Sequence, residues 1–296
     1  MDRITVLKTP ELNNPRLIIA FAGWPDAAEV ATRTVDYLVN KMKGIKFAEF
    51  DTDEFLDFTK SRPTIVVEDG VLTQINHPYN SFYYCRSDRP EHDLVLLQGT
   101  EPHLRWRTFF NTLLGFAKQL GVNQIITLGG LYDNVSHTRP PKVTAIVNTV
   151  ALKTQLHDLG IETTNYQGPG AIHSVLLSAS SKAKLQMISL WGHSPFYLRG
   201  GPNAKVCQAL VVALNQLLDI NLAMNDFEKS ARQMDVALDR LMSKNQNLRS
   251  HIQRLEQEHD TALISSTPLE GSDKIINDVE EFLRREQQRD KENDSP

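Results

Sequence analysis

Polar and charged side chains that could do chemistry gather in three short stretches of this sequence, each directly after an apolar run. The stretches are Gly23 to Asp26, Gln98 to Arg105, and Gly129 to Pro140. Loops that follow strands are where α/β folds place their ligands. We therefore predict that these stretches form a pocket or an interface. The candidate residues are Trp24, Asp26, Glu101, Arg105, Gly129, Gly130, Asp133, His137 and Arg139.

The first two stretches also suit a purely structural role. Asp26 with Glu29 three residues later is a capping-box pattern at the start of a helix. Glu101 and Arg105 are four residues apart, so they could form an ion pair on the first turn of a second helix. We favour the cap and the ion pair over a direct ligand contact, although a residue can serve both purposes.

The third stretch is the most unusual one. Gly129 and Gly130 end an apolar run, and Asp133, His137 and Arg139 follow within one short polar loop. Such a loop could clamp an anion or supply a general base. It could equally be a subunit contact, because Arg and Tyr are enriched in interfaces. An interface or structural loop is the favoured interpretation, and we assign no catalytic residue.

Motifs and composition exclude several classes of function. The sequence has no G-x-x-x-x-G-K-[ST] loop, no G-x-G-x-x-G turn and no H-E-x-x-H spacing, so we expect no cofactor and no metal. Lys+Arg number 32 against 36 Asp+Glu, which argues against a nucleic-acid partner. The two cysteines share no motif, and no apolar run nears the roughly 20 residues that span a bilayer. We therefore expect a cytoplasmic protein that binds no membrane.

Alternating apolar runs and helical patterns must position the three stretches. A run over Leu94–Leu97, a helix over about Pro102–Leu120 and a run over Gln124–Leu128 form a strand–helix–strand unit, which predicts two parallel neighbouring strands. Asp69-Gly70 lies between two further runs and is a strong hairpin signal. We expect a strand over Asn80–Arg86 to extend that antiparallel patch.

These elements predict an α/β fold with three layers, α/β/α, around a mixed sheet. Its domain should span residues 1–220, and residues 221–296 should form a helical appendage. The other expected strands are Leu17–Phe21, Thr64–Val67, Leu72–Ile75, Val143–Val147 and Leu185–Leu190, and the other expected helices are about Asp26–Met42, Val150–Leu159, Ala171–Ser180 and Ala204–Ile220.

The appendage carries an apolar stripe whose spacing alternates between four and three residues, which is typical of a coiled coil. It runs from Phe227 to Leu255. The central residues of this seam are Met234, Leu238, Leu241, Asn245, Leu248 and Ile252. Asn245 falls at an a position, where a polar residue can fix register and oligomer state. The alternative is an amphipathic helix that packs on its own domain. A linker over about Asp260–Ser272 and a second helix around Ile275–Leu283 should complete a helical hairpin.

Short blocks between Leu17 and Leu218 match, in order, those of a known family. They are Phe21 to Ala28, Arg62-Pro63, Glu68-Asp69-Gly70, Gly99 to Trp106, Thr127 to Leu131, Val135 to Pro140, Tyr166 to Pro169 and Leu190 to His193. Together they closely resemble the prokaryotic branch of the proteasome assembly chaperone family, of the second-subunit type. The resemblance implies a three-layer fold like that of nucleoside phosphorylases, and a homo-oligomer, with a trimer favoured.

The resemblance also implies a non-catalytic role, since eukaryotic relatives help proteasome α-subunits to assemble. The leading hypothesis is an assembly-chaperone-like or scaffold protein that acts as a homo-oligomer on a protein partner. The alternative is a small-molecule-binding protein or enzyme with a pocket at the strand carboxyl ends. It would be an ATP-dependent carboxylate–amine ligase, a label the family often carries, or hydrolase- or phosphorylase-like. The one E-x-N sequence, Glu11-Leu12-Asn13, lies in an N-terminal loop, which does not suit a ligase.

Overall fold

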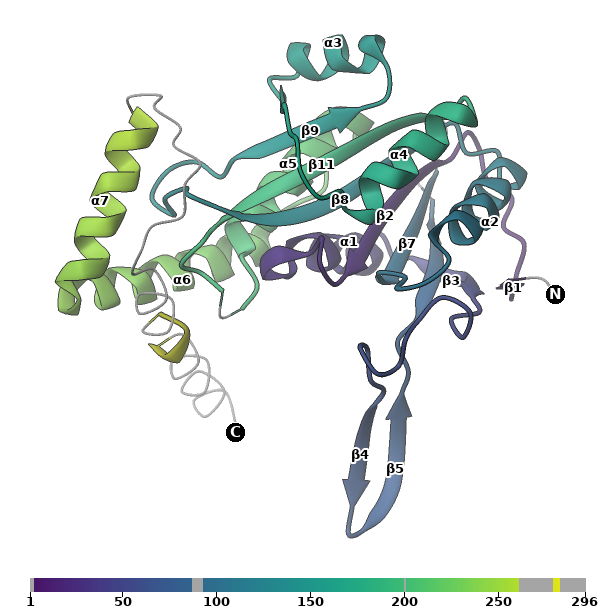
Figure 1. Cartoon of the computed structure of the whole chain (residues 1–296), viewed down its shortest axis with the longest axis horizontal. Helices are drawn as coiled ribbons and strands as arrows, with labels where there is room; N and C mark the ends of the chain where they lie inside the picture. Colours follow the sequence, from purple (N-terminus) through teal and green to yellow (C-terminus); the bar gives the residue numbers. More distant parts are fainter. Residues whose placement is uncertain (1–2, 87–92, 200, 261–278, 283–296) are drawn as a thin grey trace. The chain divides into compact units, whose positions relative to one another are not determined.

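The computed structural model describes residues 3–86, 93–199, 201–260 and 279–282 (Figure 1). The strands are β1 Ile4–Val6, β2 Arg16–Ala22, β3 Ile45–Phe50, β4 Thr64–Glu68, β5 Val71–Asn76, β6 Asn80–Cys85, β7 Leu94–Thr100, β8 Gln124–Asp133, β9 Val143–Val147, β10 Glu162–Thr163 and β11 Gln186–Pro195. The helices are the 3-10 turn η1 Ala27–Glu29, then α1 Val30–Lys41, α2 Trp106–Gln119, α3 Val150–Asp158, α4 Ile172–Lys182, α5 Ala204–Leu218, α6 Asn225–Lys244 and α7 Gln246–Asp260.

Nine strands form one mixed sheet in the order β1-β3-β6-β7-β2-β8-β11-β9-β10. Strand β2 is parallel to both β7 and β8, and β6 is antiparallel to β3 and β7. The predicted α/β class with a mixed sheet is therefore confirmed. The predicted adjacency of β7 and β8 is wrong, because β2 lies between them and Arg16 faces Leu94 on one side and Gln124 on the other. The strand–helix–strand pattern indicates the direction of two strands, but it does not say how many strands the crossover spans.

Helices cover both faces of this sheet, which makes the three layers. Leu17, Ile19 and Phe21 of β2 belong to one core cluster that also contains residues of α2 and α4. Ile18 and Ala20 point to the opposite face, as alternate strand residues must, and they are fully buried as well. A strand buried on both faces has to be apolar at nearly every position, which is how β2 reads in the sequence.

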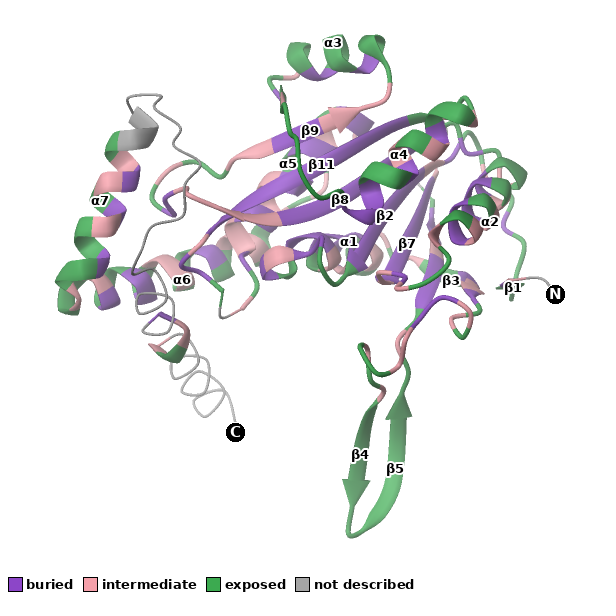
Figure 2. Ribbon diagram, viewed as in Figure 1, coloured by how far each residue is buried: buried purple, intermediate pink, exposed green. Residues whose placement is uncertain are grey.

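The predicted hairpin forms, but it stands apart from the main sheet. Strands β4 and β5 make a separate two-stranded sheet. Asp69 and Gly70 both have positive φ, 50° and 81°, as a type I′ turn requires. The expectation that β6 closes this patch is wrong, because β6 pairs with β7 and with β3, a strand that the sequence patterns did not reveal. Figure 2 shows the hairpin exposed along its whole length.

The chain packs as two compact units. Unit 1 holds residues 1–26, 31–129 and 145–190, and unit 2 holds residues 27–30, 130–144 and 191–296. Strands β8 and β11 each contribute residues to both units. The predicted boundary at residue 220 stays a prediction.

The helical appendage is interrupted at Asn245. Its backbone is extended, with φ −126° and ψ 98°, so α6 ends at Lys244 and α7 begins at Gln246. The Asn245 side-chain oxygen accepts a 3.0 Å hydrogen bond from the Leu248 backbone N–H. The predicted unbroken coiled coil with Asn245 in its seam is therefore wrong. Asn is among the strongest N-cap residues, and here it starts a new helix.

The apolar stripe of the appendage is buried by the chain itself. Leu238, Leu241, Leu248, Ile252 and Leu255 form one cluster with Tyr197 and Leu198, and Met234 packs against it. Val279 and Phe282 join the same cluster, whereas Ile275, Leu283 and nearly all of the predicted linker lie outside the described residues. This packing matches the alternative of helices that pack on their own chain. Pairing between copies through these residues stays a prediction.

Candidate functional site

Asp26 caps the first long helix. Its carboxylate accepts hydrogen bonds from the backbone N–H groups of Ala31, at 2.7 Å, and Thr32, at 3.3 Å. The predicted cap is confirmed, but its partnership with Glu29 is wrong. Ala28 and Glu29 both have left-handed backbones, so the helix begins only at Val30 and Glu29 stands outside it. The carboxylate of Asp26 is thereby used to satisfy orphan amides of α1.

Glu101 joins the ends of strands β2 and β7 to the start of helix α4. Its carboxylate accepts an N–H from Trp24 at 3.3 Å and another from Ile172, the first residue of α4. Burial raises the pKa of Glu101, and the two backbone hydrogen bonds oppose that rise. Trp24 is thus held beside Glu101, with its own side chain 65% exposed.

Arg105 does not pair with Glu101. Its guanidinium lies 3.0 Å from the carboxylate of Glu54. Arg105 has a left-handed backbone, φ 53°, and precedes the first residue of α2, so the expected helical spacing of four residues never arises. The predicted Glu101–Arg105 ion pair is therefore wrong.

The two glycines of the third stretch lie inside β8, not at its end, because the strand continues to Asp133. A side chain at Gly130 would stand 2.6 Å from the Ala27 carbonyl oxygen and 2.5 Å from a methyl group of Val30. Only glycine allows this close approach of backbone segments. Gly130 thus serves the packing of the strand, and neither glycine contributes a side chain to a site.

Asp133 belongs to a hydrogen-bonded chain across three neighbouring strands. Its carboxylate lies 2.8 Å from Nδ1 of His193, and Nε2 of His193 lies 2.9 Å from the Thr144 hydroxyl. The hydrogen bond from His193 lowers the pKa of Asp133. Both ring nitrogens of His193 are engaged, so its imidazole is held in one orientation. The sequence reading did not connect His193 and Thr144 with Asp133, because they lie on separate strands.

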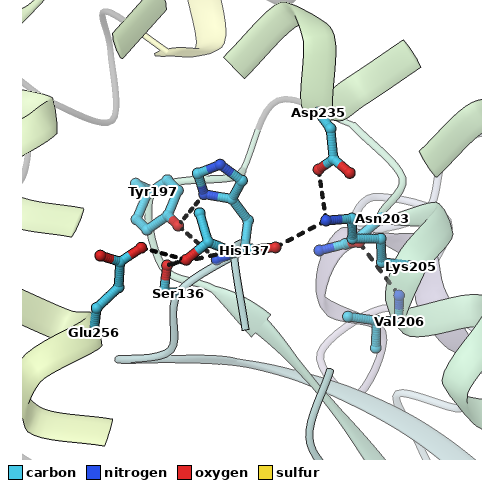
Figure 3. Close-up of polar contacts among 9 residues, drawn as sticks. Ser136, His137, Tyr197, Asn203, Lys205, Val206, Asp235 and Glu256 are labelled. Atoms are coloured by element: carbon cyan, nitrogen blue, oxygen red, sulfur yellow. Dashed lines mark hydrogen bonds and ion pairs between the residues drawn. The ribbon is translucent and has the colours of Figure 1, made fainter. Parts of the chain in front are cut away.

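His137 is held by Tyr197, as Figure 3 shows. The Tyr197 hydroxyl lies 2.9 Å from the His137 backbone nitrogen and 2.7 Å from its Nδ1. Burial is the main cause that lowers the pKa of His137 to about 4, so the ring is neutral at pH 7. The His137 carbonyl oxygen accepts a 2.9 Å hydrogen bond from Lys205, whose ammonium group also pairs with Asp235.

A small, partly open hollow lies between the loop after β8 and the first turn of α5. Its lining includes three cationic side chains, and the described residues around it contribute no carboxylate. We call this site the α5 hollow. It is lined by Val135, Ser136, His137, Arg139, Pro140, Pro141, Lys142, His193, Pro195, Asn203, Lys205 and Val206.

The structure therefore divides the predicted residues into two groups. Trp24, Asp26, Glu101, Arg105 and Gly129 belong to unit 1, whereas Gly130, Asp133, His137 and Arg139 belong to unit 2. Trp24 meets Glu101, and His137 and Arg139 line the α5 hollow. Convergence of all of them on one edge of the sheet stays a prediction.

Three further properties of the described part of the chain concern metal ligands, membrane-length helices and the cysteines. There, no group of three or more His, Cys, Asp or Glu side chains could hold a metal ion. None of the helices described is long and apolar enough to cross a membrane. Cys85 and Cys207 are both buried as free thiols, and burial raises the pKa of Cys85 to about 12, so it is an unreactive thiol.

A family model of the PAC2 family matches residues 20–242, which is most of the chain. The chain belongs to the PAC2 family. This result confirms the resemblance to proteasome assembly chaperones that the sequence blocks indicated. The match covers the main sheet except β1 and the first four residues of β2, together with the α5 hollow and most of α6. A search of curated proteins finds no match.

Solved structures agree with this assignment. A PAC2 family protein from Streptomyces avermitilis is 33% identical, with a TM-score of 0.73, over 81% of this chain and 99% of that one. A proteasome-assembly chaperone homologue from Mycobacterium tuberculosis is 30% identical, with a TM-score of 0.73, over 80% of this chain and 99% of that one. The archaeal proteasome activator PbaB from Pyrococcus furiosus shares the fold, with a TM-score of 0.65 at 21% identity, over 81% of this chain and 99% of that one.

Proposed function

We propose that this PAC2 family member is a non-catalytic, chaperone-like protein that binds proteasome subunits as a homo-oligomer. The proposal draws on the Mycobacterium relative, which is named a proteasome-assembly chaperone homologue. It also fits the use of the predicted polar residues. Asp26 and Glu101 satisfy backbone N–H groups, and Asp133 and His137 bond to His193 and Tyr197.

The β4–β5 hairpin is the observation that carries the proposal. Every residue of both strands is exposed. The register places Ile65 opposite Ile75 and Val67 opposite Leu72, so these four aliphatic side chains share one face. Their exposed fractions run from 49% to 59%. We call this surface the hairpin face.

A free hairpin of this kind is physically unusual. A two-stranded hairpin is only marginally stable alone in water, and its two outer edges offer unpaired backbone groups. An exposed cluster of aliphatic side chains commonly marks a site of protein binding. A folded protein with an apolar groove would cover the hairpin face and stabilise the hairpin. A proteasome subunit is the partner that the family favours.

The test mixes the full chain with proteasome subunits from the same organism and measures binding by analytical size exclusion and calorimetry. The double variant Ile65→Thr/Leu72→Thr removes apolar surface from the hairpin face and keeps or improves strand propensity. We expect it to weaken binding at least tenfold. The matched control is Val66→Thr/Val71→Thr, which alters exposed apolar residues on the opposite face and should leave the affinity unchanged.

The outcomes separate the possible occupants. Equal binding by both double variants and the native chain would contradict a role for the hairpin face. Loss of self-association in the Ile65→Thr/Leu72→Thr variant, without a change in subunit binding, would assign the hairpin face to contacts between copies. No binding of any proteasome subunit would overturn the proposed partner.

We propose further that the chain acts in the cytoplasm as a homo-oligomer, with a trimer favoured. The support for this is the family resemblance. Light scattering coupled to size exclusion measures the molar mass of the native chain directly, and a mass of one chain, 33.5 kDa, at micromolar concentration would contradict it.

A second candidate function is a hydrolase-like activity. It is favoured by the Asp133–His193–Thr144 chain, because a carboxylate, an imidazole and a hydroxyl in that order resemble a hydrolytic triad. Thr144 is only 3% exposed, which argues for a structural bridge instead. A panel of activated esters should show no turnover above that of a Thr144→Val variant. Turnover lost in that variant would favour the hydrolase.

A further inference from the structure

Arg199 lies on an aromatic platform formed by Tyr132 of β8 and Phe196, the residue that follows β11. Its guanidinium carbon stands 3.9 Å from the ring centre of Phe196 and 5.1 Å from that of Tyr132. The two rings meet edge to face, with their centres 6.2 Å apart. A cation above an aromatic face is attracted by the electrons of the ring, so this arrangement favours one position of the arginine side chain.

Backbone contacts hold the platform in place. The Tyr132 hydroxyl accepts a 3.1 Å hydrogen bond from the Ala28 backbone N–H. The Phe196 backbone N–H donates a 3.0 Å hydrogen bond to the Asp133 carbonyl oxygen. An arginine on a fixed support loses less side-chain entropy when it binds than a freely rotating one does. Arg199 is therefore prepared for a partner in a way that an ordinary surface arginine is not.

The N–H groups of Arg199 are open to a ligand from outside the chain. Its side chain is exposed, and within the described residues it contacts the two rings but makes no hydrogen bond and no ion pair. A guanidinium presents its donors in a planar fork that matches the two oxygens of a carboxylate. Arginine is also enriched among the residues that dominate the binding energy of protein interfaces. The chemistry of this site fits a carboxylate of another polypeptide.

The β4–β5 hairpin carries two carboxylates at its tip. Glu68 is the last residue of β4, and Asp69 opens the turn. We call these two residues the hairpin tip. Both are exposed, and neither carboxylate is paired with a side chain in the part of the chain that the structure describes. They are the only charged residues between Thr64 and Asn76, so the hairpin is purely acidic.

The hairpin tip is a different surface from the hairpin face. Glu68 directly follows Val67, and successive residues of a strand point to opposite sides. The Glu68 side chain therefore points away from the hairpin face. A contact at the tip leaves the hairpin face open to a second partner.

We propose that the hairpin tip of one copy binds Arg199 of a second copy, with a carboxylate of the tip against the guanidinium that Tyr132 and Phe196 support. A second copy is the occupant that charge favours, because this one sequence contains both an open, supported cation and an exposed, purely acidic hairpin. The two surfaces differ, so the contact is heterologous, and repeating it closes a ring when the rotation between copies allows. The inference rests on the proposed homo-oligomer and names residues that join its copies.

Charge reversal tests the contact through the self-association of the full chain, measured by sedimentation velocity over a concentration series. Glu68→Arg and Arg199→Glu should each raise the midpoint concentration of association about tenfold or more, because like charges replace a charge-assisted pair. The double variant Glu68→Arg/Arg199→Glu makes the charges opposite again and should recover much of that loss. A recovery of this kind cannot come from misfolding, because the double variant contains both substitutions.

Matched controls make the same changes of charge elsewhere. Glu162→Arg on β10 and Lys118→Glu on α2 alter exposed residues and should associate as the native chain does. Phe196→Leu keeps the charge of Arg199 but removes the ring beneath it, so it should also weaken association. Unchanged association in Arg199→Glu would overturn the contact, and so would a double variant that associates no better than either single variant.

The outcomes keep this contact apart from the proposed function. A native chain that stays monomeric would overturn the homo-oligomer and the contact together. An oligomer that Arg199→Glu leaves intact would overturn the contact alone. Ile65→Thr/Leu72→Thr retains both carboxylates of the hairpin tip, so it should self-associate as the native chain does and lose only the binding of proteasome subunits.

Discussion

Two regions of this protein carry similar stripes of aliphatic side chains, but one stripe is exposed and the other is buried. On the hairpin face, Ile65, Val67, Leu72 and Ile75 are about half exposed. On α6 and α7, Leu238, Leu248 and Ile252 are fully buried by the chain's own residues. The comparison teaches that the spacing of apolar residues identifies a surface that tends to be buried. The spacing does not say whether the same chain or another molecule buries it. The helical stripe suggested contacts between copies, yet the hairpin is the region that remains uncovered.

The largest expected effect comes from the buried stripe. Leu248→Ala should destabilise the protein by about 2–5 kcal/mol, because it leaves a cavity in a packed cluster. Leu72→Ala on the hairpin face should cost less than about 0.5 kcal/mol, because its side chain already contacts water. Urea unfolding at pH 7.5 measures both. If both variants lost the same free energy of unfolding, the two stripes would not differ in burial as described.

Acid should lower the free energy of unfolding through His137, whose partner Tyr197 packs against the buried stripe. The pKa of His137 is lowered from 6.5 to about 4, mainly by burial, and its partner Tyr197 belongs to the cluster that covers α6 and α7. A histidine with a depressed folded pKa stabilises the fold above pH 6.5. That contribution is lost by roughly 1.4 kcal/mol per pH unit as the pH falls from 6.5 towards 4.

A variant isolates this effect from other titrating groups, including the buried His173, whose pKa burial lowers to about 3. The stability difference between the native chain and His137→Asn, measured by urea unfolding, should shrink as the pH drops through this window. His157→Gln is the matched control, because His157 is exposed on α3. A difference that stays constant from pH 7.5 to 4.5 would show that His137 does not titrate in the folded protein with this shift.

The break at Asn245 bears on the same comparison, because it divides the buried stripe between two helices, α6 and α7. Asn245→Ala should destabilise by about 1 kcal/mol through loss of the cap on α7, whereas Asn245→Ser should keep most of the stability. Urea unfolding and far-ultraviolet circular dichroism report on this. A stabilised Asn245→Ala variant with increased helicity would instead favour one continuous coiled coil.

The smallest expected effect belongs to the hairpin. Ile65→Thr/Ile75→Thr should change the free energy of unfolding by no more than about 0.5 kcal/mol, because both side chains are exposed and threonine suits a strand. Binding of an apolar fluorescent dye should fall in this variant. A loss of several kcal/mol would mean that the hairpin face is already covered in the native protein.

Local patterns predicted much of the fold. The Asp69-Gly70 turn, the starts of α3 and α5, and the buried strand β2 match the sequence reading closely, since each depends on short-range spacing or on one turn. Strand β3 was missed because Ile45–Phe50 mixes Lys and Glu with apolar residues. Only part of this strand is buried, so its sequence shows no continuous apolar run. Local spacing also suggested a Glu101–Arg105 pair, which the left-handed backbone of Arg105 prevents.

The candidate site was only partly predictable. Arg139 and His137 could be found from the polar loop after two glycines. Lys205 could not, because it lies 68 residues from the carbonyl group that holds it. Asp133, His193 and Thr144 likewise became one hydrogen-bonded chain only through the order of strands β8, β11 and β9.

The sequence by itself determined the α/β class, the hairpin turn, the apolar stripes and the family, because these follow from the chemistry of neighbouring residues. The tertiary structure decided which stripe is covered, which partner each charge takes and that Asn245 starts a helix instead of joining a seam. Those outcomes depend on which distant surfaces meet. The energy of a buried side chain or a paired charge comes from the groups that surround it in space.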